Sequence, residues 1–253
     1  MDSSTLKTKN KYLLEVCSFS LQSSLVAERV GAHRVELCAN PIEGGTTPSY
    51  GAIKVVRDKV SIQLYPLLRP RAGNYWYSDE ELEILKKDIL LCRELKCDGI
   101  SVGVQLQNGL LDLDSMKQIV DLAYPLGVTC NRAFDTMPDP YAALELLIDC
   151  GCERVLTSGL ASTAPDGSSV LKKLVAQANN RITIMPGAGI KSSNIAMLIK
   201  ETQATEYHTS ARKLVPNTVS FSNPAILDFG NVYLADEQEL AAVISIMEQT
   251  SIV

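Results

Sequence analysis

The stretch Leu14-Glu15-Val16-Cys17 returns further along the chain as Val35-Glu36-Leu37-Cys38, with the same order of apolar residue, glutamate, apolar residue and cysteine. In an extended strand, alternate side chains point to the same face, so each glutamate shares a face with the cysteine two residues after it. A carboxylate among apolar neighbours is unstable unless it is paired or hydrogen-bonded. The repeat therefore predicts two adjacent parallel strands that end at one polar pocket.

Each of these two strands is followed by the signals of a helix. Ser20 is placed to cap a helix that runs to about Val30 and stops at Gly31, and Ser49 is placed to cap a helix that runs to about Lys59. The alternation of strand and helix continues along the chain. The predicted strands cover 12–16, 34–37, 62–68, 99–103, 128–133, 154–158, 182–186 and 206–209, and the later helices cover about 79–95, 114–124, 138–150, 168–178, 192–200 and 236–249.

The predicted strands are short and almost entirely apolar, as strands covered on both faces are. Eight strand and helix units, with no linker rich in Pro, Gly or Ser between them, indicate a single α/β domain over residues 11–253, a TIM-type (β/α)8 barrel. An open doubly wound sheet is the alternative. The barrel is favoured because polar residues follow every strand, whereas an open sheet gathers them near one switch point. We expect residues 1–10 to form a flexible tail and residues 213–232 to be irregular.

The composition excludes several classes of protein. Although 46% of the 253 residues are hydrophobic, no apolar run approaches the roughly 20 residues of a membrane helix. A net charge of −5 argues against a nucleic-acid or anionic-membrane partner. The first ten residues lack the apolar core of a secretory signal. Seven cysteines, an odd number without a Cys-x-x-Cys motif, favour free thiols in a reducing compartment, so we expect a cytoplasmic protein.

Polar residues after the strands supply the candidates for chemistry, because the working residues of such barrels lie on the loops that follow the strands. The candidates for proton transfer are Glu15, Glu36, Asp135 and His208, and the candidates for binding an anion are Arg69, Arg71, Asn131, Arg132, Ser158, Gly187, Gly189 and Ser210. The turn Gly187-Ala188-Gly189 precedes a helix, an arrangement typical of an anion cradle. The loops after the seventh and eighth strands often form a phosphate site in this fold.

Each of these candidates also has a structural interpretation. The two glutamates could pair with the arginines of the third and fifth loops as buried ion pairs. Asp135 could cap the helix that begins near Pro138, and His208 could have a hydrogen-bonded packing role. The glycine turn could be no more than a tight turn. The other histidine, His33, precedes a strand, and we expect it to be structural.

Two cysteines are candidates for binding a metal. Cys17 and Cys38 leave adjacent strands at matched positions, and neighbouring strands lie about 4.8 Å apart, which would let both thiolates reach one ion. Two thiolates without further sulfur or imidazole suit Cu(I) more than zinc, which takes four ligands. Both cysteines could instead be small buried hydrophobes. Cys150-Gly151-Cys152 also has a spacing typical of metal ligands, but it precedes a strand, at the end of the barrel where residues serve stability rather than function, so we discount it.

Seven stretches together give the chain a family resemblance: Leu14-Glu15-Val16-Cys17, Gly31-Ala32-His33-Arg34-Val35-Glu36-Leu37-Cys38, Glu43-Gly44-Gly45-Thr46-Thr47-Pro48-Ser49, Arg69-Pro70-Arg71-Ala72-Gly73, Arg132-Ala133-Phe134-Asp135, Leu156-Thr157-Ser158-Gly159 and Pro186-Gly187-Ala188-Gly189-Ile190. Over about residues 12–212 the chain resembles the copper homeostasis protein CutC family. The resemblance implies a TIM-type barrel, a cytoplasmic location, a homodimer or higher oligomer, and Cu(I) ligands at Cys17 and Cys38. Relatives have a histidine where this chain has Asn131, and Ala72 and Asn74 replace their usual Gly and Asp.

Two functions follow from these observations. The first is a cytosolic protein of copper homeostasis that binds Cu(I) through Cys17 and Cys38. The alternative is a barrel enzyme of the lyase or isomerase type that acts on a small anionic, in some cases phosphorylated, metabolite. The absence of a lysine at the end of a strand makes a Schiff-base mechanism less attractive. The expected partners are a copper ion or a small anion and further copies of the chain, with no organic cofactor, nucleic acid or membrane.

Overall fold

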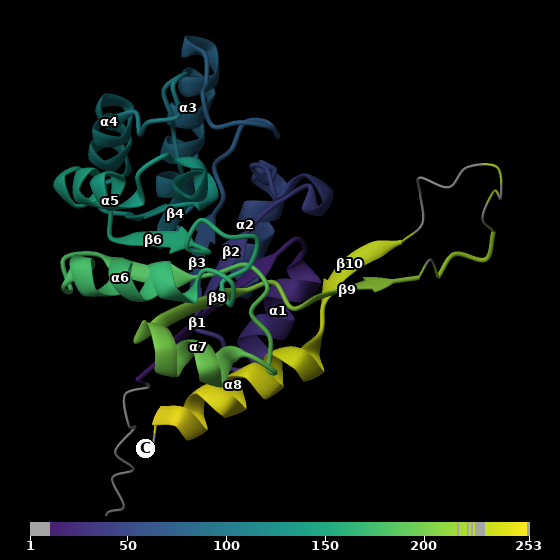
Figure 1. Cartoon of the computed structure of the whole chain (residues 1–253). Helices are drawn as coiled ribbons and strands as arrows, with labels where there is room; N and C mark the ends of the chain where they lie inside the picture. The colour runs from purple at the N-terminus through teal and green to yellow at the C-terminus, as the bar shows by residue number, and fades with distance from the viewer. Residues whose placement is uncertain (1–10, 217, 222, 224, 226–230, 252–253) are drawn as a thin grey trace, which may run out of the picture.

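A parallel β-barrel surrounded by helices forms the body of the molecule (Figure 1). The computed structural model describes residues 11–216, 218–221, 223, 225 and 231–251, and the predicted tail, residues 1–10, lies outside them. The strands of the barrel are β1 (Leu13–Ser18), β2 (Arg34–Leu37), β3 (Gln63–Pro66), β4 (Gly99–Val102), β5 (Gly127–Cys130), β6 (Arg154–Thr157), β7 (Thr183–Pro186) and β8 (Glu206–Thr209). The helices around it are α1 (Leu21–Arg29), α2 (Tyr50–Lys59), α3 (Asp79–Glu94), α4 (Leu113–Ala123), α5 (Pro140–Asp149), α6 (Ser168–Ala178), α7 (Ile195–Thr202) and α8 (Glu237–Ser251).

The pairing of the strands distinguishes a closed barrel from an open sheet. Parallel pairing gives the orders β3-β2-β1-β8 and β4-β5-β6-β7. The two halves meet where Leu67 forms a bridge with Ser101, just after β3, and where β7 contacts β8. The predicted TIM-type barrel is therefore confirmed. Strands β1 and β2 are adjacent, as the repeated stretch predicts, but the register pairs Cys17 with Glu36, so the expectation that Cys17 and Cys38 lie at matched positions was wrong.

The predicted helix starts at Ser20 and Ser49 are confirmed. Each serine side chain accepts a hydrogen bond from a backbone N–H group three residues later, which satisfies a donor at the start of the helix. Several other boundaries differ by two or three residues, of which two have a clear effect on the loops. Strand β5 ends at Cys130 because Asn131 caps the short 3-10 helix η2 (Arg132–Thr136). Helix α7 begins later than predicted, at Ile195.

Apolar residues fill the layer between the barrel and the helices, but the interior of the barrel is charged. The first residues of β2, β6 and β8 are Arg34, Arg154 and Glu206, and all three are buried. Barrels of this class usually fill their interior with branched apolar side chains. Here the interior instead holds a set of ion pairs, which leads up to the C-terminal ends of the strands.

An antiparallel hairpin interrupts the segment predicted to be irregular. Strands β9 (Arg212–Val215) and β10 (Val232–Ala235) pair with each other and extend away from the barrel (Figure 1). The base of the hairpin is fixed where the backbone N–H of Ala235 donates to Ser23 of α1. Residues 213–232 were predicted to be irregular, and this prediction was wrong at both ends of the segment, where β9 and β10 lie. Across the described part of the chain, no helix combines the length and apolar character needed to cross a membrane.

Candidate functional site

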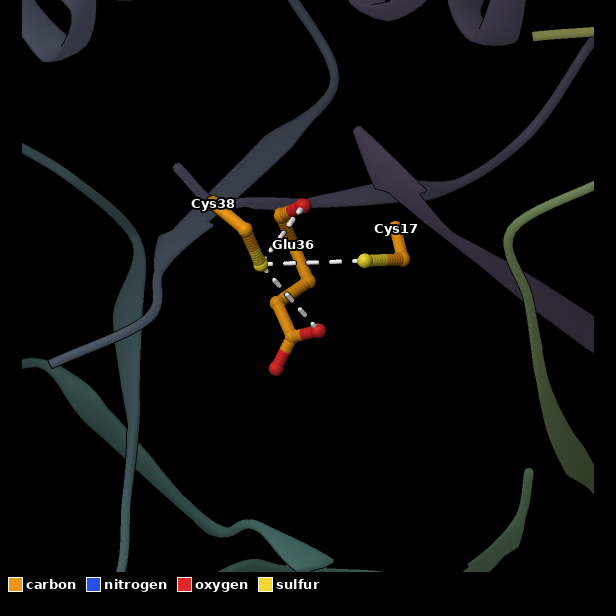
Figure 2. Close-up of side chains that lie close together, drawn as sticks. All are labelled: Cys17, Glu36 and Cys38. Carbon is orange, nitrogen blue, oxygen red and sulfur yellow. Dashed lines mark hydrogen bonds between the residues drawn. The ribbon is translucent and has the colours of Figure 1, made fainter. Parts of the chain in front are cut away.

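Two cysteine sulfurs and a carboxyl group meet at the C-terminal mouth of the barrel (Figure 2). Cys17 lies near the end of β1 and Cys38 directly follows β2, and their Sγ atoms are 3.7 Å apart. The Sγ atom of Cys38 is also 3.6 Å from Oε2 of Glu36. Cys38 is buried whereas Cys17 is half-buried, so solvent reaches this group through Cys17. The predicted approach of the two thiols is thus present in the structure.

A chain of ion pairs lies beneath this group, inside the barrel. Oε1 of Glu15 is 2.7 Å from Nδ1 of His208, and its Oε2 is 3.1 Å from Arg34. The carboxylate of Glu206 then joins Arg34, at 3.0 Å, to Arg154, at 2.6 Å. Glu15 therefore has a buried structural partner, but the partner is Arg34 rather than an arginine of the third or fifth loop. Such a network fixes the position of the His208 imidazole ring.

The chain of charges sets the protonation of the mouth. Burial would raise the pKa of Glu15, but the hydrogen bond and the charge of His208 lower it to about 2. The hydrogen bond with Cys38 lowers the pKa of the Cys17 thiol to about 5, against the opposing effect of burial. Burial raises the pKa of Cys38, and burial together with the Cys17 thiolate raises the pKa of Glu36 to about 8. At neutral pH the mouth thus holds one thiolate, one thiol and a protonated carboxyl group.

Two cavities open at this mouth and share part of their walls. The first, of about 410 Å³, is bounded by residues of the second, third and fifth loops. The second, of about 660 Å³, lies toward the loops after β7 and β8. Both are lined by Cys17, Gly44, Arg132 and His208. Glu15 lines neither cavity, so it acts on the mouth only through His208.

Asp135 lies on the wall of the first cavity and does not cap a helix. Its carboxylate accepts hydrogen bonds from Arg132, at 2.7 Å, and from the backbone N–H of Ser158. The cap of α5 is Asp139, whose side chain accepts from two backbone N–H groups. The capping interpretation of Asp135 was therefore wrong. Ser158 is fully buried, and its hydroxyl contacts Asp135 rather than the wall of either cavity.

The two arginines of the third loop have different surroundings. Arg69 is buried, lines the first cavity and donates to the backbone carbonyl groups of Glu43, Gly45 and Gly73. Arg71 lines neither cavity and forms an ion pair of 2.6 Å with Glu81 at the start of α3. The structure therefore brings Arg69, but not Arg71, to the mouth.

The glycine turn faces the second cavity. Ala188 and Gly189 both have a φ of +74°, and Gly189 and Ser210 line this cavity. Gly187 lies behind the wall, where a Cβ atom would come within 2.5 Å of the Leu156 side chain. Three residues after Gly189 the chain reaches Ser192, whose N–H and hydroxyl both donate to the carboxylate of Glu239.

Several residues of the site were missed at the sequence level. Arg34, Arg154 and Glu206 hold the charges beneath the mouth, and Tyr75 lines the first cavity. The sequence did contain a signal for them. Arg34 and Glu36 are two charged residues two positions apart in an otherwise apolar strand, so both lie on the same face of that strand. The expected structural role of His33 fits its contact, because its Nδ1 atom accepts the backbone N–H of Leu14.

The fold and the mouth define a single-domain TIM-type barrel with a thiol and carboxyl pocket at the C-terminal ends of its strands. The barrel is similar to phosphoribosyl anthranilate isomerase of Thermotoga maritima, with a TM-score of 0.60 over 94% of this chain and 99% of that one. At 11% identity, this likeness concerns the fold alone. Residues 12–213 match the CutC family model, and the chain belongs to the CutC family.

Individual relatives agree with this assignment. The chain is 44% identical over 217 residues to the copper homeostasis protein cutC homolog of Mus musculus, which covers 86% of this chain and 80% of the relative. It is 45% identical over 214 residues to the CutC family protein of Parabacteroides distasonis, covering 84% and 88% respectively. The crystal structure of CutC from Streptococcus agalactiae, at 33% identity, gives a TM-score of 0.75 over 79% of this chain and 98% of that one. The resemblance seen in the sequence motifs is confirmed.

Proposed function

We propose that the protein acts in copper homeostasis by binding Cu(I) between Cys17 and Cys38. The observation that carries this proposal is the 3.7 Å separation of the two sulfurs at a solvent-accessible mouth. Thiolates are the ligands that select Cu(I), and the pKa of about 5 keeps Cys17 ionised at neutral pH. The names of the mouse and human relatives, copper homeostasis protein cutC homologs, support the same function.

The surroundings of the sulfurs suit a small soft ion. The loop that follows β2 folds closely over Cys38, because a Cβ atom on Gly45 would lie 2.7 Å from Leu67 and 3.6 Å from the sulfur of Cys38. Cys17 is then the ligand that an incoming ion meets first, and Cys38 completes the site from below. The carboxylate of Glu15 is already bound to Arg34 and His208, so it is a poor ligand for a second cation.

A second candidate is a barrel enzyme of the lyase or isomerase type. The observation in its favour is the first cavity, whose volume of about 410 Å³ is within the range of sites for small molecules and far exceeds that of one ion. Glu36 lines this cavity, and a carboxyl group whose pKa is near 8 can deliver or accept a proton at neutral pH.

We further propose a cytosolic location and a homodimer or higher oligomer. All seven cysteines are free in the structure, which suits a reducing compartment. The oligomeric state follows from the family resemblance, and light scattering on the purified protein measures it.

A competition titration tests copper binding. The protein is titrated with Cu(I) against a chromogenic Cu(I) chelator, and the Cys17→Ser/Cys38→Ser variant is compared with the matched Cys150→Ser/Cys152→Ser variant. Loss of even an outer partner of a metal ligand costs about 10 to 100-fold in affinity, so removal of both ligands is expected to cost about 100-fold or more. The matched variant should keep the affinity of the unchanged protein. Equal affinity in both variants would overturn the proposal.

A further inference from the structure

We propose that the first cavity binds a small organic anion bearing a carboxylate or phosphate group, with Arg69 as its counter-charge. This inference deepens the second candidate function, because it names the class of ligand, and it does not depend on copper binding. The inference depends on the positive charge of Arg69, which lines the cavity and has no carboxylate partner among the described residues.

Three arginines are buried in the described part of the chain, and one of them differs from the other two. Arg34 and Arg154 each have a glutamate carboxylate within 3.1 Å. Arg69 is only 5% exposed, and no carboxylate of the described residues lies within the 4.0 Å of an ion pair. A buried charge without a counter-charge is strongly unfavourable. An anion in the adjoining cavity would supply the missing charge.

The contacts of Arg69 leave its charge unbalanced. Its two terminal nitrogens donate to backbone carbonyl groups at 2.6 to 2.9 Å, and its buried Nε has no partner. The ring of Tyr75 lies 5.0 Å from the guanidinium carbon, a contact that offsets part of the cost of burial. Carbonyl groups and an aromatic ring carry no net charge. The guanidinium therefore projects a positive potential into the cavity that it lines.

Two neighbours supply further donors for the same ligand. Asn131 is buried on the cavity wall, and its carbonyl oxygen accepts the N–H of Ala133, which leaves its NH2 group available. Arg132 is held in place by Asp135 and Ser158 while its side chain remains 41% exposed. Asn131 thus adds a neutral double donor to the cavity wall that Arg69 also lines.

The acids of the cavity do not cancel this potential. Glu36 and Cys17 both face His208, whose Nε2 atom lies 3.8 Å from the Glu36 carboxyl oxygen and whose ring also hydrogen-bonds with the sulfur of Cys17, so neither adds an unpaired negative charge to the cavity. Asp135 is paired with Arg132, and Glu43 is exposed at the rim, where water screens its charge.

The glycine turn is a less suitable place for the anion than the wall at Arg69. The donors of Ser192, which follow the turn, already hold the carboxylate of Glu239 at 2.7 and 3.0 Å. A second anion there would meet this carboxylate. We therefore assign the anion to the cavity wall at Arg69 rather than to the predicted site at Gly187 and Gly189.

Calorimetric titration with malonate and with inorganic phosphate tests the inference, with glycerol as a neutral probe. We expect at least one of the two anions to bind and glycerol not to bind. Binding of malonate alone would identify a carboxylate ligand, and binding of phosphate alone a phosphate ligand. If neither anion binds, the inference is overturned.

Variants show whether Arg69 is responsible. Arg69→Met should lose about tenfold or more in affinity, the usual effect of removing a hydrogen-bonding charge. Arg71→Met, which removes the same group two residues away and outside the cavity, should bind as the unchanged protein does. Since Arg69 also holds backbone carbonyls, Arg69→Lys separates charge from loop structure and should retain more affinity than Arg69→Met. Equal affinity in Arg69→Met and Arg71→Met would overturn the inference.

The same variants distinguish this inference from copper binding. Arg69→Met should bind Cu(I) with the affinity of the unchanged protein, because both sulfurs remain. Loss of anion binding with Cu(I) binding intact is the expected result. Cu(I) binding that fails while anion binding persists would overturn the copper proposal alone.

Discussion

Two pairs of cysteine sulfurs lie almost equally close in this molecule, at opposite ends of the barrel. The Cys17 and Cys38 sulfurs are 3.7 Å apart, and the Cys150 and Cys152 sulfurs are 3.6 Å apart. The first pair lies at the mouth, where Cys17 lines two cavities. The second pair precedes β6, is buried, and lines neither cavity. A short distance between two sulfurs is therefore not sufficient for a metal site. The two pairs differ in their access to solvent and in the charges around them.

Charge distinguishes the two ends further. The mouth pair adjoins His208 and Glu36, and the chain of ion pairs through Glu15 lies below it. The distant pair is surrounded by the ends of α5 and β6, and the Cys150 thiol donates to the carbonyl group of Leu147. The hydrogen bond with Cys152 lowers the pKa of Cys150 to about 7. This shift is smaller than that of Cys17, whose pKa is lowered to about 5. The comparison predicts a reactive pair at the mouth and a structural pair at the other end.

The largest expected effect comes from removing the charge beneath the mouth. Glu15→Gln should lower the free energy of unfolding by about 3 to 5 kcal/mol, because it leaves Arg34 and His208 without a buried counter-charge. Denaturant unfolding at pH 7 measures the loss. Glu145→Gln is the control, because its ion pair with Arg181 is exposed to solvent and screened by water, so its loss should change the stability far less. Similar losses in the two variants would contradict the account.

The pH dependence of the Glu15 effect has a definite sign. Its pKa falls from 4.5 to about 2 in the folded protein. A lowered acid pKa stabilises the fold above pH 4.5, and this contribution is lost as the pH falls toward 2. The difference in stability between Glu15→Gln and the unchanged protein should shrink over this range.

The next effect compares the reactivity of the two pairs. At pH 7 iodoacetamide should alkylate Cys17 faster than Cys150 or Cys152, because Cys17 is a thiolate at an accessible mouth whereas the other two cysteines are buried. Peptide mass spectrometry over time measures the rates. The rate at Cys17 should be constant from pH 7 to 8 and fall below its pKa of about 5. Faster alkylation of Cys150 would reverse the comparison.

Glu36 gives an effect of the opposite sign to Glu15, which develops gradually with pH. Its pKa rises from 4.5 to about 8 on folding, so the folded protein keeps a proton that the unfolded chain releases. The unchanged protein should therefore lose up to about 1.4 kcal/mol of stability per pH unit between pH 4.5 and 8. Glu36→Gln should remove this part of the pH dependence. Identical pH profiles of unfolding for the two proteins would contradict the assigned protonation.

The smallest effect is expected at the distant pair. Cys150→Ala should cost about 1 kcal/mol of stability, comparable with the loss of one buried methyl-sized group. Its affinity for Cu(I) should not change. A loss of copper binding in this variant, with the fold intact by circular dichroism, would mean that the two pairs are not functionally distinct.

The sequence predicted the barrel and the meeting of its first two strands, because these follow from local patterns. Apolar runs set the strands, and Ser20 and Ser49 set the starts of two helices. The repeat also predicted the approach of Cys17 and Cys38, although the β1–β2 register places Cys17 opposite Glu36 rather than opposite Cys38. For these features, local sequence and final structure agree.

The partners of the charged groups could not be predicted in the same way. Arg34 and Glu206 meet across strands that lie far apart in sequence, and only the closure of the barrel brings them together. Arg69 and Arg71 are equivalent in the sequence, yet one faces the cavity and the other Glu81. The occupation of the Ser192 donors by Glu239 likewise depends on the packing of α8. Long-range pairing therefore decides which candidates reach the site.

X-ray absorption at the copper edge of the protein loaded with one Cu(I) tests the central claim most directly. The account predicts sulfur as the dominant ligand in the unchanged protein and in Cys150→Ser/Cys152→Ser. This sulfur signal should be absent in Cys17→Ser/Cys38→Ser. Ligation by nitrogen and oxygen alone, or a sulfur signal that disappears only with Cys150 and Cys152, would contradict the assignment of copper to the mouth of the barrel.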